Sequence, residues 1–387
     1  MAANSVSGQC RVLFIFVLVR QISNSNSATS QTCKTLCPIF RQTMTRQLTL
    51  VFLLTSLLCN GQTFKSRLDS LVHKYDSLGS YNGVIIVAFR PDSIVTFEYG
   101  YKDPTTKAEK ISINDRFYLA SLSKQITGLT VLQLIDKGKI KADDPIGKYI
   151  PELKPALQKV TVQQLANHTN GIHDFHTLTS KHDSLDNKKI LAMLSKLDST
   201  VFVPGTKWGY SNSGYILLSI LVERVTKTSF PNYCTKNVLS PLNMKSVCFV
   251  PATKKVLTGY STKLEPEKFT ISYSGPEGLY ASGADIIAYY KTVCKKPDYW
   301  KKYFTMSYDL AENSNEKGWT YGFGFFFTED DFGKFRAHSG NHFGFYNYIR
   351  WYEKTNTFIC LLSNKNDDFI KKLREDVATL VKTQLKK

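Results

Sequence analysis

Acidic residues are scarce in this sequence of 387 residues, which has 50 lysines and arginines against 32 aspartates and glutamates and a formal net charge of +18. A charge of this sign raises nucleic acid or an anionic envelope surface as a partner. The chain nevertheless lacks an arginine-rich block, and it lacks a basic stripe interleaved with aromatic residues. These absences exclude the usual patterns of nucleic-acid binding, so we expect no nucleic-acid partner.

Internal repeats and low-complexity segments are also missing, which excludes a repeat array and a largely disordered chain. The composition is 42% hydrophobic and 13% aromatic. That is enough apolar material for a large core, in one domain or in two lobes.

Cysteines are few and irregularly spaced, and no C-x-x-C pair occurs. Beyond residue 61 the chain has Cys234, Cys248, Cys294 and Cys360. Cys360 lies in F-I-C-L-L, a pattern typical of a buried strand, so we expect a core thiol there. A disulfide between Cys234 and Cys248 is possible in an exported protein, but the sequence does not decide it.

The first 61 residues contain no acidic residue. Met44 is followed by one arginine, then by an apolar run of roughly a dozen residues and then by small residues. This is the pattern of a secretory signal peptide, which would span residues 44–61. The run is short for a membrane span. We therefore expect translation to start at Met44, residues 1–43 to be an over-called extension, and the product to be exported to the periplasm or envelope. N-terminal sequencing of the native protein tests this, because it should begin near Gln62 and not at Met1.

Cys59 offers a second interpretation of the same segment, namely a lipid-attachment cysteine. Leu58 precedes it, where lipoprotein signals favour a small residue, and this weakens the lipoprotein interpretation.

Residues 62–387 show strand-like sequence at both ends of one predicted domain. Helical spacing over Phe64–Leu78 precedes two strand-like runs, G-V-I-I-V-A-F and S-I-V-T-F-E-Y-G. About residues 139–300 are mostly helical in pattern, and four runs of period two then follow before an amphipathic helix over Asp367–Lys386. This order predicts an α+β fold in which a central antiparallel sheet carries terminal helices and a mostly helical lobe is inserted.

The stretch F-Y-L-A-S-L-S-K places Ser121 three residues before Lys124, at the start of a predicted helix over about 121–137. Residues three apart on a helix face the same way. A serine hydroxyl needs a base to become a nucleophile, and a lysine serves only if its pKa is lowered. The alternative is a capping serine beside a surface lysine.

Two further elements carry polar residues that could join such a pair. In F-V-P-G-T-K-W-G-Y-S-N, Tyr210 and Asn212 follow a Pro-Gly turn and precede an apolar helix. In A-H-S-G-N, His338, Gly340 and Asn341 lie on a strand pattern, where a glycine permits close approach of a substrate backbone. The alternatives are a structural loop tyrosine and a sheet-edge histidine.

In this order, S-x-x-K, Y-x-N and a basic residue followed by x-Gly resemble the serine beta-lactamase / penicillin-binding protein superfamily. The chain is most similar to the class C beta-lactamase-like branch, which includes DD-peptidases and esterases. Other stretches fit the same pattern from about Phe64 to Leu385, among them D-D-P-I-G-K-Y-I-P, L-A-N-H-T-N-G-I and G-L-Y-A-S-G-A-D. The resemblance implies an active site between the sheet and the helical lobe.

The resemblance implies that Ser121 is the acylated nucleophile. It further implies that Lys124 and Tyr210 share general base and acid work, with Asn212 bonded to a substrate amide. No cofactor is needed for this chemistry, and the implied substrate is an ester, a D-amino-acid peptide or a beta-lactam.

The resemblance also implies substrate contacts for the strand that contains A-H-S-G-N. His338 stands where many beta-lactamases have lysine, and there it would bind a substrate carboxylate or assist Tyr210; Gly340 belongs to the same contact. This departure implies an esterase or peptidase more than an efficient beta-lactamase. The backbone N–H groups of Ser121 and Asn341 would form the oxyanion hole.

These motifs allow two other interpretations. His168, His173, Asp174 and His176 cluster in N-H-T-N-G-I-H-D-F-H, but their spacing matches no zinc pattern, so we expect no metal there and a loop lining the cleft. The rival function is a non-catalytic envelope binding or scaffolding protein on the same fold. The presence of the serine, the lysine and the tyrosine together favours the enzyme.

Overall fold

The computed structural model describes residues 64–75, 81–179, 184–268, 270–314 and 318–386. These ranges belong to one compact unit, Phe64–Lys387, separate from residues 1–63. The predicted signal peptide and extension therefore lie outside the described residues, as do the last three positions of the predicted helix Phe64–Leu78, of which residues 64–75 are helical. Among the helices that the structure describes, none is both long and apolar enough to cross a bilayer.

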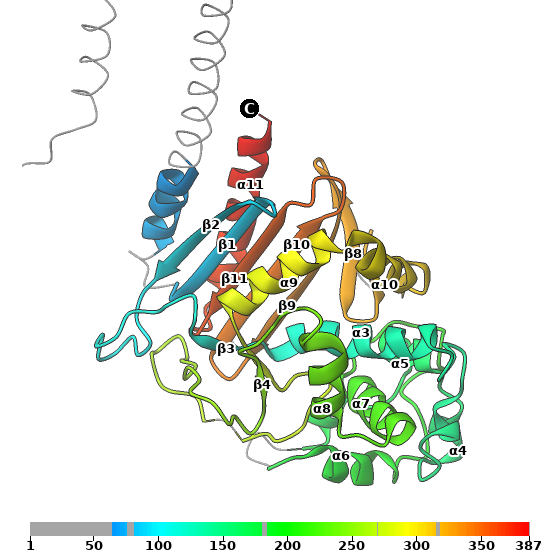
Figure 1. Ribbon diagram of the computed structural model, residues 1–387. Helices are drawn as coiled ribbons and strands as arrows, with labels where there is room; N and C mark the ends of the chain where they lie inside the picture. The colour runs from blue at the N-terminus through cyan, green and yellow to red at the C-terminus, as the bar shows by residue number, and fades with distance from the viewer. Residues whose placement is uncertain (1–63, 76–80, 180–183, 269, 315–317, 387) are drawn as a thin grey trace, which may run out of the picture. The chain divides into compact units, whose positions relative to one another are not determined.

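An eight-stranded antiparallel sheet forms the centre of this unit, in the order β2-β1-β11-β10-β9-β8-β7-β6 (Figure 1). Its strands are β1 Gly83–Arg90, β2 Ser93–Tyr99, β6 Glu312–Asn313, β7 Thr320–Gly322, β8 Phe325–Asp330, β9 Gly333–His342, β10 Phe345–Tyr352 and β11 Phe358–Ser363. β1 pairs with β11, so the two ends of the chain build one sheet. The predicted α+β architecture is confirmed.

Both faces of the sheet are covered. Successive side chains of a strand point to opposite faces, so alternate residues enter two different cores. On one face, residues 64–75 and the terminal helix α11 (Phe369–Leu385) pack over side chains such as Ile85 and Leu361. On the other face, α9 (Gly283–Lys295) packs over Val84 and Trp351. Strands buried on both faces are apolar throughout, as β1 and β11 are.

The helical lobe lies beside the end of the sheet where β9 finishes, and Figure 1 shows α3 between that end and the other helices. Its helices are α3 Ser123–Asp136, α4 Pro155–Gln158, α5 Val162–Ala166, α6 Asn187–Leu194, α7 Asn212–Thr226 and α8 Phe230–Cys234, and α10 (Pro297–Asp309) follows α9. A small sheet of β3 (Arg116–Tyr118), β5 (Leu279–Ser282) and β4 (Cys248–Phe249) joins the lobe to the nucleophile segment. The small sheet was not predicted from the sequence.

The four described cysteines are free thiols, so Cys234 and Cys248 form no disulfide. Cys360 is fully buried in β11, as its apolar run indicated. Cys294 on α9 is the partly exposed one of the four.

Candidate active site

Ser121 lies in a 3₁₀ turn, η2 (Ala120–Leu122), immediately before α3, and not in the first turn of the helix as expected. Ala120 adopts φ +47°, a left-handed conformation that costs free energy for a residue with a Cβ. The turn packs against β9 of the large sheet. The segment that carries the serine is therefore held in an uncommon conformation by the surrounding structure.

Lys124 is fully buried, which excludes the alternative of a surface lysine. Its Nζ lies 3.0 Å from Ser121 Oγ, 2.8 Å from Asn212 Oδ1 and 2.9 Å from the carbonyl oxygen of Pro276. A neutral amine has two N–H donors and one lone pair. The amide and carbonyl oxygens take the two donors, which leaves the lone pair for the serine hydroxyl.

Burial lowers the pKa of Lys124 to about 7, against the opposing charges of Glu277 and Asp174, which raise it. Removing an ammonium from water disfavours its charged form. A substantial fraction of Lys124 is therefore neutral near pH 7, as a general base for Ser121 requires.

Asn212 is the first residue of α7, and both ends of its carboxamide are engaged within the protein. Its Oδ1 accepts from Lys124, while its Nδ2 donates to Asp174 Oδ2 at 3.1 Å. The Asn212 backbone N–H donates to the same carboxylate oxygen at 2.6 Å. Asp174 thus fixes the amide so that its oxygen faces Lys124, a role for Asp174 that its histidine-rich sequence context did not reveal.

Tyr210 covers the Lys124 amine, whose Nζ lies 4.8 Å from the centre of the tyrosine ring. Tyr210 is 36% exposed as a whole residue, but its hydroxyl lies among protein atoms, and this desolvation raises the pKa of the phenol. The hydrogen bond with Ser121 offsets only part of this effect. The phenol is therefore protonated at neutral pH.

His338 is buried on β9 and holds both ring nitrogens in contacts with the protein. Nδ1 donates to the Ser339 carbonyl oxygen at 2.6 Å, and Nε2 accepts from the Tyr321 hydroxyl at 3.1 Å. Burial, followed by the nearby Lys124, lowers the pKa of His338 to about 3. The side chain is neutral at physiological pH, so it brings no positive charge to either expected role, contact with a substrate carboxylate or assistance to Tyr210.

Gly340 is required by a close contact within the protein's own backbone. A Cβ at this position would lie 2.1 Å from the carbonyl oxygen of Leu119, the residue before η2. The missing side chain therefore lets β9 and the nucleophile turn touch. This is a different reason for the glycine from the one expected.

The backbone N–H of Asn341 points to the edge of β9 that faces the turn of Ser121. The two-residue turn after His342 pairs that residue with Phe345, and hydrogen bonding alternates along a strand, so the Asn341 N–H is directed away from β10. On its other side β9 pairs with β8 only as far as Ala337. The turn that carries Ser121 packs against the open edge beyond, which is the position an oxyanion-hole donor needs.

A buried carboxylate, Glu277, lies one residue after the Pro276 carbonyl that holds Lys124, and the sequence analysis missed it. It accepts from Tyr273 and from His342 Nδ1, the latter at 2.8 Å, and His176 Nε2 lies 3.9 Å away. Burial acts to raise the pKa of Glu277, but His342 and Tyr273 outweigh it and hold this pKa at about 2. The Glu277 carboxylate is therefore ionised at neutral pH and is held by His342 and Tyr273.

His168, in the 168–176 segment, has a structural role. His168 is buried and accepts from the Ser211 N–H at 3.1 Å, and its ring centre lies 4.3 Å from that of Tyr210 in a tilted arrangement. Burial lowers the pKa of His168 well below its usual value. Within the described ranges no group of three or more histidine, cysteine or acidic side chains is arranged to hold a metal ion.

An amine base in contact with a serine hydroxyl at the edge of a large antiparallel sheet defines the class of serine hydrolase-type proteins. The chain belongs to the beta-lactamase family, because the family model described as Beta-lactamase matches residues 68–381. Membership of this family supports a serine hydrolase-type activity and confirms the resemblance stated from the motifs.

Two curated relatives illustrate the similarity. The chain is 26% identical over 336 residues to protein flp of Staphylococcus aureus strain MW2, a match that covers 82% of this chain and 66% of that protein. It is 29% identical over 212 residues to penicillin-binding protein 4* of Bacillus subtilis strain 168, covering 54% of this chain and 44% of that protein. In both cases the match spans less than two thirds of the relative's length.

Solved structures share the fold at low sequence identity. A D-amino acid amidase from Ochrobactrum anthropi SV3, in complex with L-phenylalanine, aligns with a TM-score of 0.72 at 17% identity, over 83% of this chain and 99% of that one. The octameric penicillin-binding protein homologue from Pyrococcus abyssi aligns with a TM-score of 0.69 at 24% identity, over 78% and 73%. These alignments identify a common architecture.

Proposed function

We propose that this protein hydrolyses an ester or amide through an acyl-enzyme on Ser121. The observation that carries the proposal is the buried Lys124 amine, 3.0 Å from the Ser121 hydroxyl and with a pKa near 7. In acylation, neutral Lys124 accepts the hydroxyl proton while Ser121 Oγ attacks the carbonyl carbon. The N–H groups of Ser121 and Asn341 stabilise the oxyanion, and Tyr210 relays the proton to the leaving group.

In deacylation, water attacks the same carbonyl carbon and the acyl group leaves Ser121 as an acid. Tyr210 and Lys124 take the proton from that water and return one to Ser121 Oγ, so the cycle restores the starting protonation. No step calls for a cofactor.

For substrate class we propose esters or amides that lack a carboxylate next to the scissile bond, in preference to beta-lactams. Two features of the site support this choice. His338 is neutral and engaged with Tyr321 and Ser339, and Glu277 places an ionised carboxylate next to the Pro276 carbonyl that holds Lys124. A substrate carboxylate would therefore gain little and would be repelled. We also propose that the protein is exported, on the strength of residues 44–61 alone.

Labelling of the full chain with an alkyl fluorophosphonate tests the nucleophile. Attack of Ser121 Oγ on phosphorus displaces fluoride and leaves a stable phosphonyl ester, which intact mass spectrometry detects and peptide mapping locates. We expect one adduct, on the peptide that contains Ser121. A labelled peptide elsewhere, or a chain that hydrolyses p-nitrophenyl butyrate without being labelled, would contradict the proposal.

The pH dependence of acylation should follow Lys124. Because the neutral amine is the active form, kcat/KM for p-nitrophenyl butyrate should rise through pH 7 and level off, with the value at pH 6 about tenfold below the plateau. Glu277→Gln should move the inflection to lower pH, because it removes a negative charge that raises the pKa of Lys124. An inflection that stays in place in this isosteric variant would show that Lys124 does not set the profile.

A further inference from the structure

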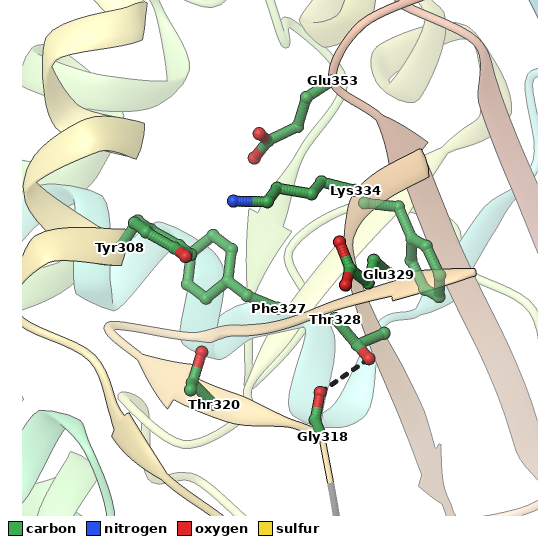
Figure 2. Close-up of a pocket in the computed structure, with 9 residues that line it drawn as sticks. Tyr308, Gly318, Thr320, Phe327, Thr328, Glu329, Lys334 and Glu353 are labelled. Carbon is green, nitrogen blue, oxygen red and sulfur yellow. Dashed lines mark hydrogen bonds between the residues drawn. The ribbon is translucent and has the colours of Figure 1, made fainter. Parts of the chain in front are cut away.

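The end of strand β9, where Asn341 carries the proposed oxyanion donor, lacks a neighbouring strand on one side. At the start of β9, Lys334 pairs with Glu329 of β8, and both residues line the small hollow drawn in Figure 2. This pairing stops at Ala337, whereas β9 continues to His342. An oxyanion donor works only if its position is fixed before the reaction. The last residues of β9 therefore need other contacts on the open side.

The side chain of His342 supplies such a contact. Its Nδ1 lies 2.8 Å from Oε2 of Glu277, a residue that is only 4% exposed. An ionised carboxylate only accepts hydrogen bonds, so Nδ1 carries the proton and donates it in a charge-assisted bond. The Tyr273 hydroxyl donates to the other oxygen of the same carboxylate, which fixes its orientation. The residue next to the oxyanion donor is thus held by a buried and oriented anion.

The backbone on either side of Glu277 is bonded to the segment that carries the nucleophile. The carbonyl oxygen of Pro276 accepts from Lys124 Nζ at 2.9 Å. The carbonyl oxygen of Leu279 accepts from the Leu119 N–H at 2.8 Å. These two bonds lie before and after the turn of the nucleophile along the chain. Glu277 therefore joins the end of β9 to the same short segment that holds the base.

We propose that Glu277 and His342 are positioning residues for the hydrolysis proposed for Ser121, on which this inference rests. Their hydrogen bond ties the end of β9 to the segment that binds Lys124. It thereby sets the distance between the Asn341 N–H and the carbonyl under attack. Neither side chain touches the reacting atoms. The tie should act mainly in the transition state, because the oxyanion forms only there.

Two substitutions of His342 test the tie. His342→Phe keeps a ring, which in the native protein lies 3.8 Å from that of Phe343 in a stacked arrangement, but removes the donor. His342→Asn places an amide N–H close to the position of Nδ1. At the high-pH plateau, where the charge of Lys124 no longer changes, kcat/KM for p-nitrophenyl butyrate should fall about 10-fold to 100-fold in His342→Phe. His342→Asn should restore it to within about threefold of wild type.

Butylboronic acid gives a readout that a general loss of structure would not reproduce. Ser121 Oγ forms a bond to boron and passes its proton to Lys124, and one hydroxyl of the tetrahedral adduct occupies the oxyanion position. Its Ki should rise in His342→Phe by the same factor as kcat/KM falls, and should recover in His342→Asn. Thermal melting of both variants is the control for folding, and His342→Ala replaces His342→Phe if that variant does not fold.

Hydrogen exchange of the peptide 338–346, measured by mass spectrometry on the full chain, follows the tie without any substrate. Exchange should be faster in His342→Phe than in wild type and in His342→Asn. A folded His342→Phe with wild-type Ki and kcat/KM, or a His342→Asn as impaired as His342→Phe, would overturn this inference and leave the hydrolysis in place. A wild-type chain in which Ser121 is neither labelled by the fluorophosphonate nor needed for hydrolysis would overturn the proposed function, and this inference with it.

Discussion

Replacing Lys124 by methionine should reduce kcat/KM for an activated ester by roughly 10⁴-fold or more, the order of loss seen when the base of a serine hydrolase is removed. Methionine matches the length of lysine but has no basic nitrogen. The Ser121 hydroxyl would keep its place and lose the group 3.0 Å away that accepts its proton.

Lys124→Arg distinguishes a base from a positioning group. Arginine can donate to Asn212 Oδ1 and the Pro276 carbonyl oxygen as Lys124 does, but its guanidinium does not lose its proton in the working pH range. We therefore expect Lys124→Arg to be as inactive as Lys124→Met. Ser121→Ala is the reference for complete loss of acylation.

Burst-phase kinetics with p-nitrophenyl butyrate, together with thermal melting, measures both effects. In Lys124→Met the cost of burying an amine disappears, while two acceptors lose their donor, so the melting temperature should shift by only a few degrees. An arginine variant that keeps a tenth of the wild-type acylation rate would show that Lys124 holds the site together without acting as its base.

The large sheet and its terminal helices could be predicted from sequence because their patterns are local. Alternation in Y-G-F-G-F-F-F-T and the apolar run around Cys360 reflect which faces of β8 and β11 are buried. The small sheet could not be predicted in the same way. Its three strands are two to four residues long and come from three distant parts of the chain, so none carries a readable period.

In the candidate site, too, residues close in sequence could be predicted together and residues distant in sequence could not. Ser121 and Lys124 are close because they are three residues apart, and Tyr210 and Asn212 could be added only through motif order. Glu277 and His342 meet across 65 residues of sequence, and nothing near either of them indicates the other.

The charge state of His338 also could not be predicted from the sequence. Its low pKa depends on burial and on the field of Lys124, which are properties of the folded packing. The same holds for the lowered pKa of Lys124, since the S-x-x-K spacing says which residues are adjacent but not how dry their surroundings are.

Gly340→Ala should reduce activity by about 100-fold, since a displacement of about 1 Å at a reacting centre can have that effect. The added Cβ would lie 2.1 Å from the Leu119 carbonyl oxygen and 3.2 Å from the Leu122 nitrogen, both backbone atoms. The Leu119 N–H donates to Leu279 at 2.8 Å, and the Tyr118 carbonyl accepts from Asn347 at 2.8 Å. The turn is pinned from behind and cannot retreat without breaking these bonds.

The strain should separate β9 from the turn of Ser121, where the proposed oxyanion hole forms, and should lower the free energy of unfolding by about 2 kcal/mol as overpacking does. Gly283→Ala is the matched control. Gly283 begins α9, and a Cβ there would meet mainly the movable side chain of Ile113. Melting temperature, kcat/KM and the rate of fluorophosphonate labelling are measured for both variants. If Gly340 only made room for a substrate, Gly340→Ala would raise KM and leave labelling by the small phosphonate unchanged. If Gly340 instead serves the contact with Leu119, Gly340→Ala should lose labelling and hydrolysis to a comparable extent, while Gly283→Ala stays close to wild type.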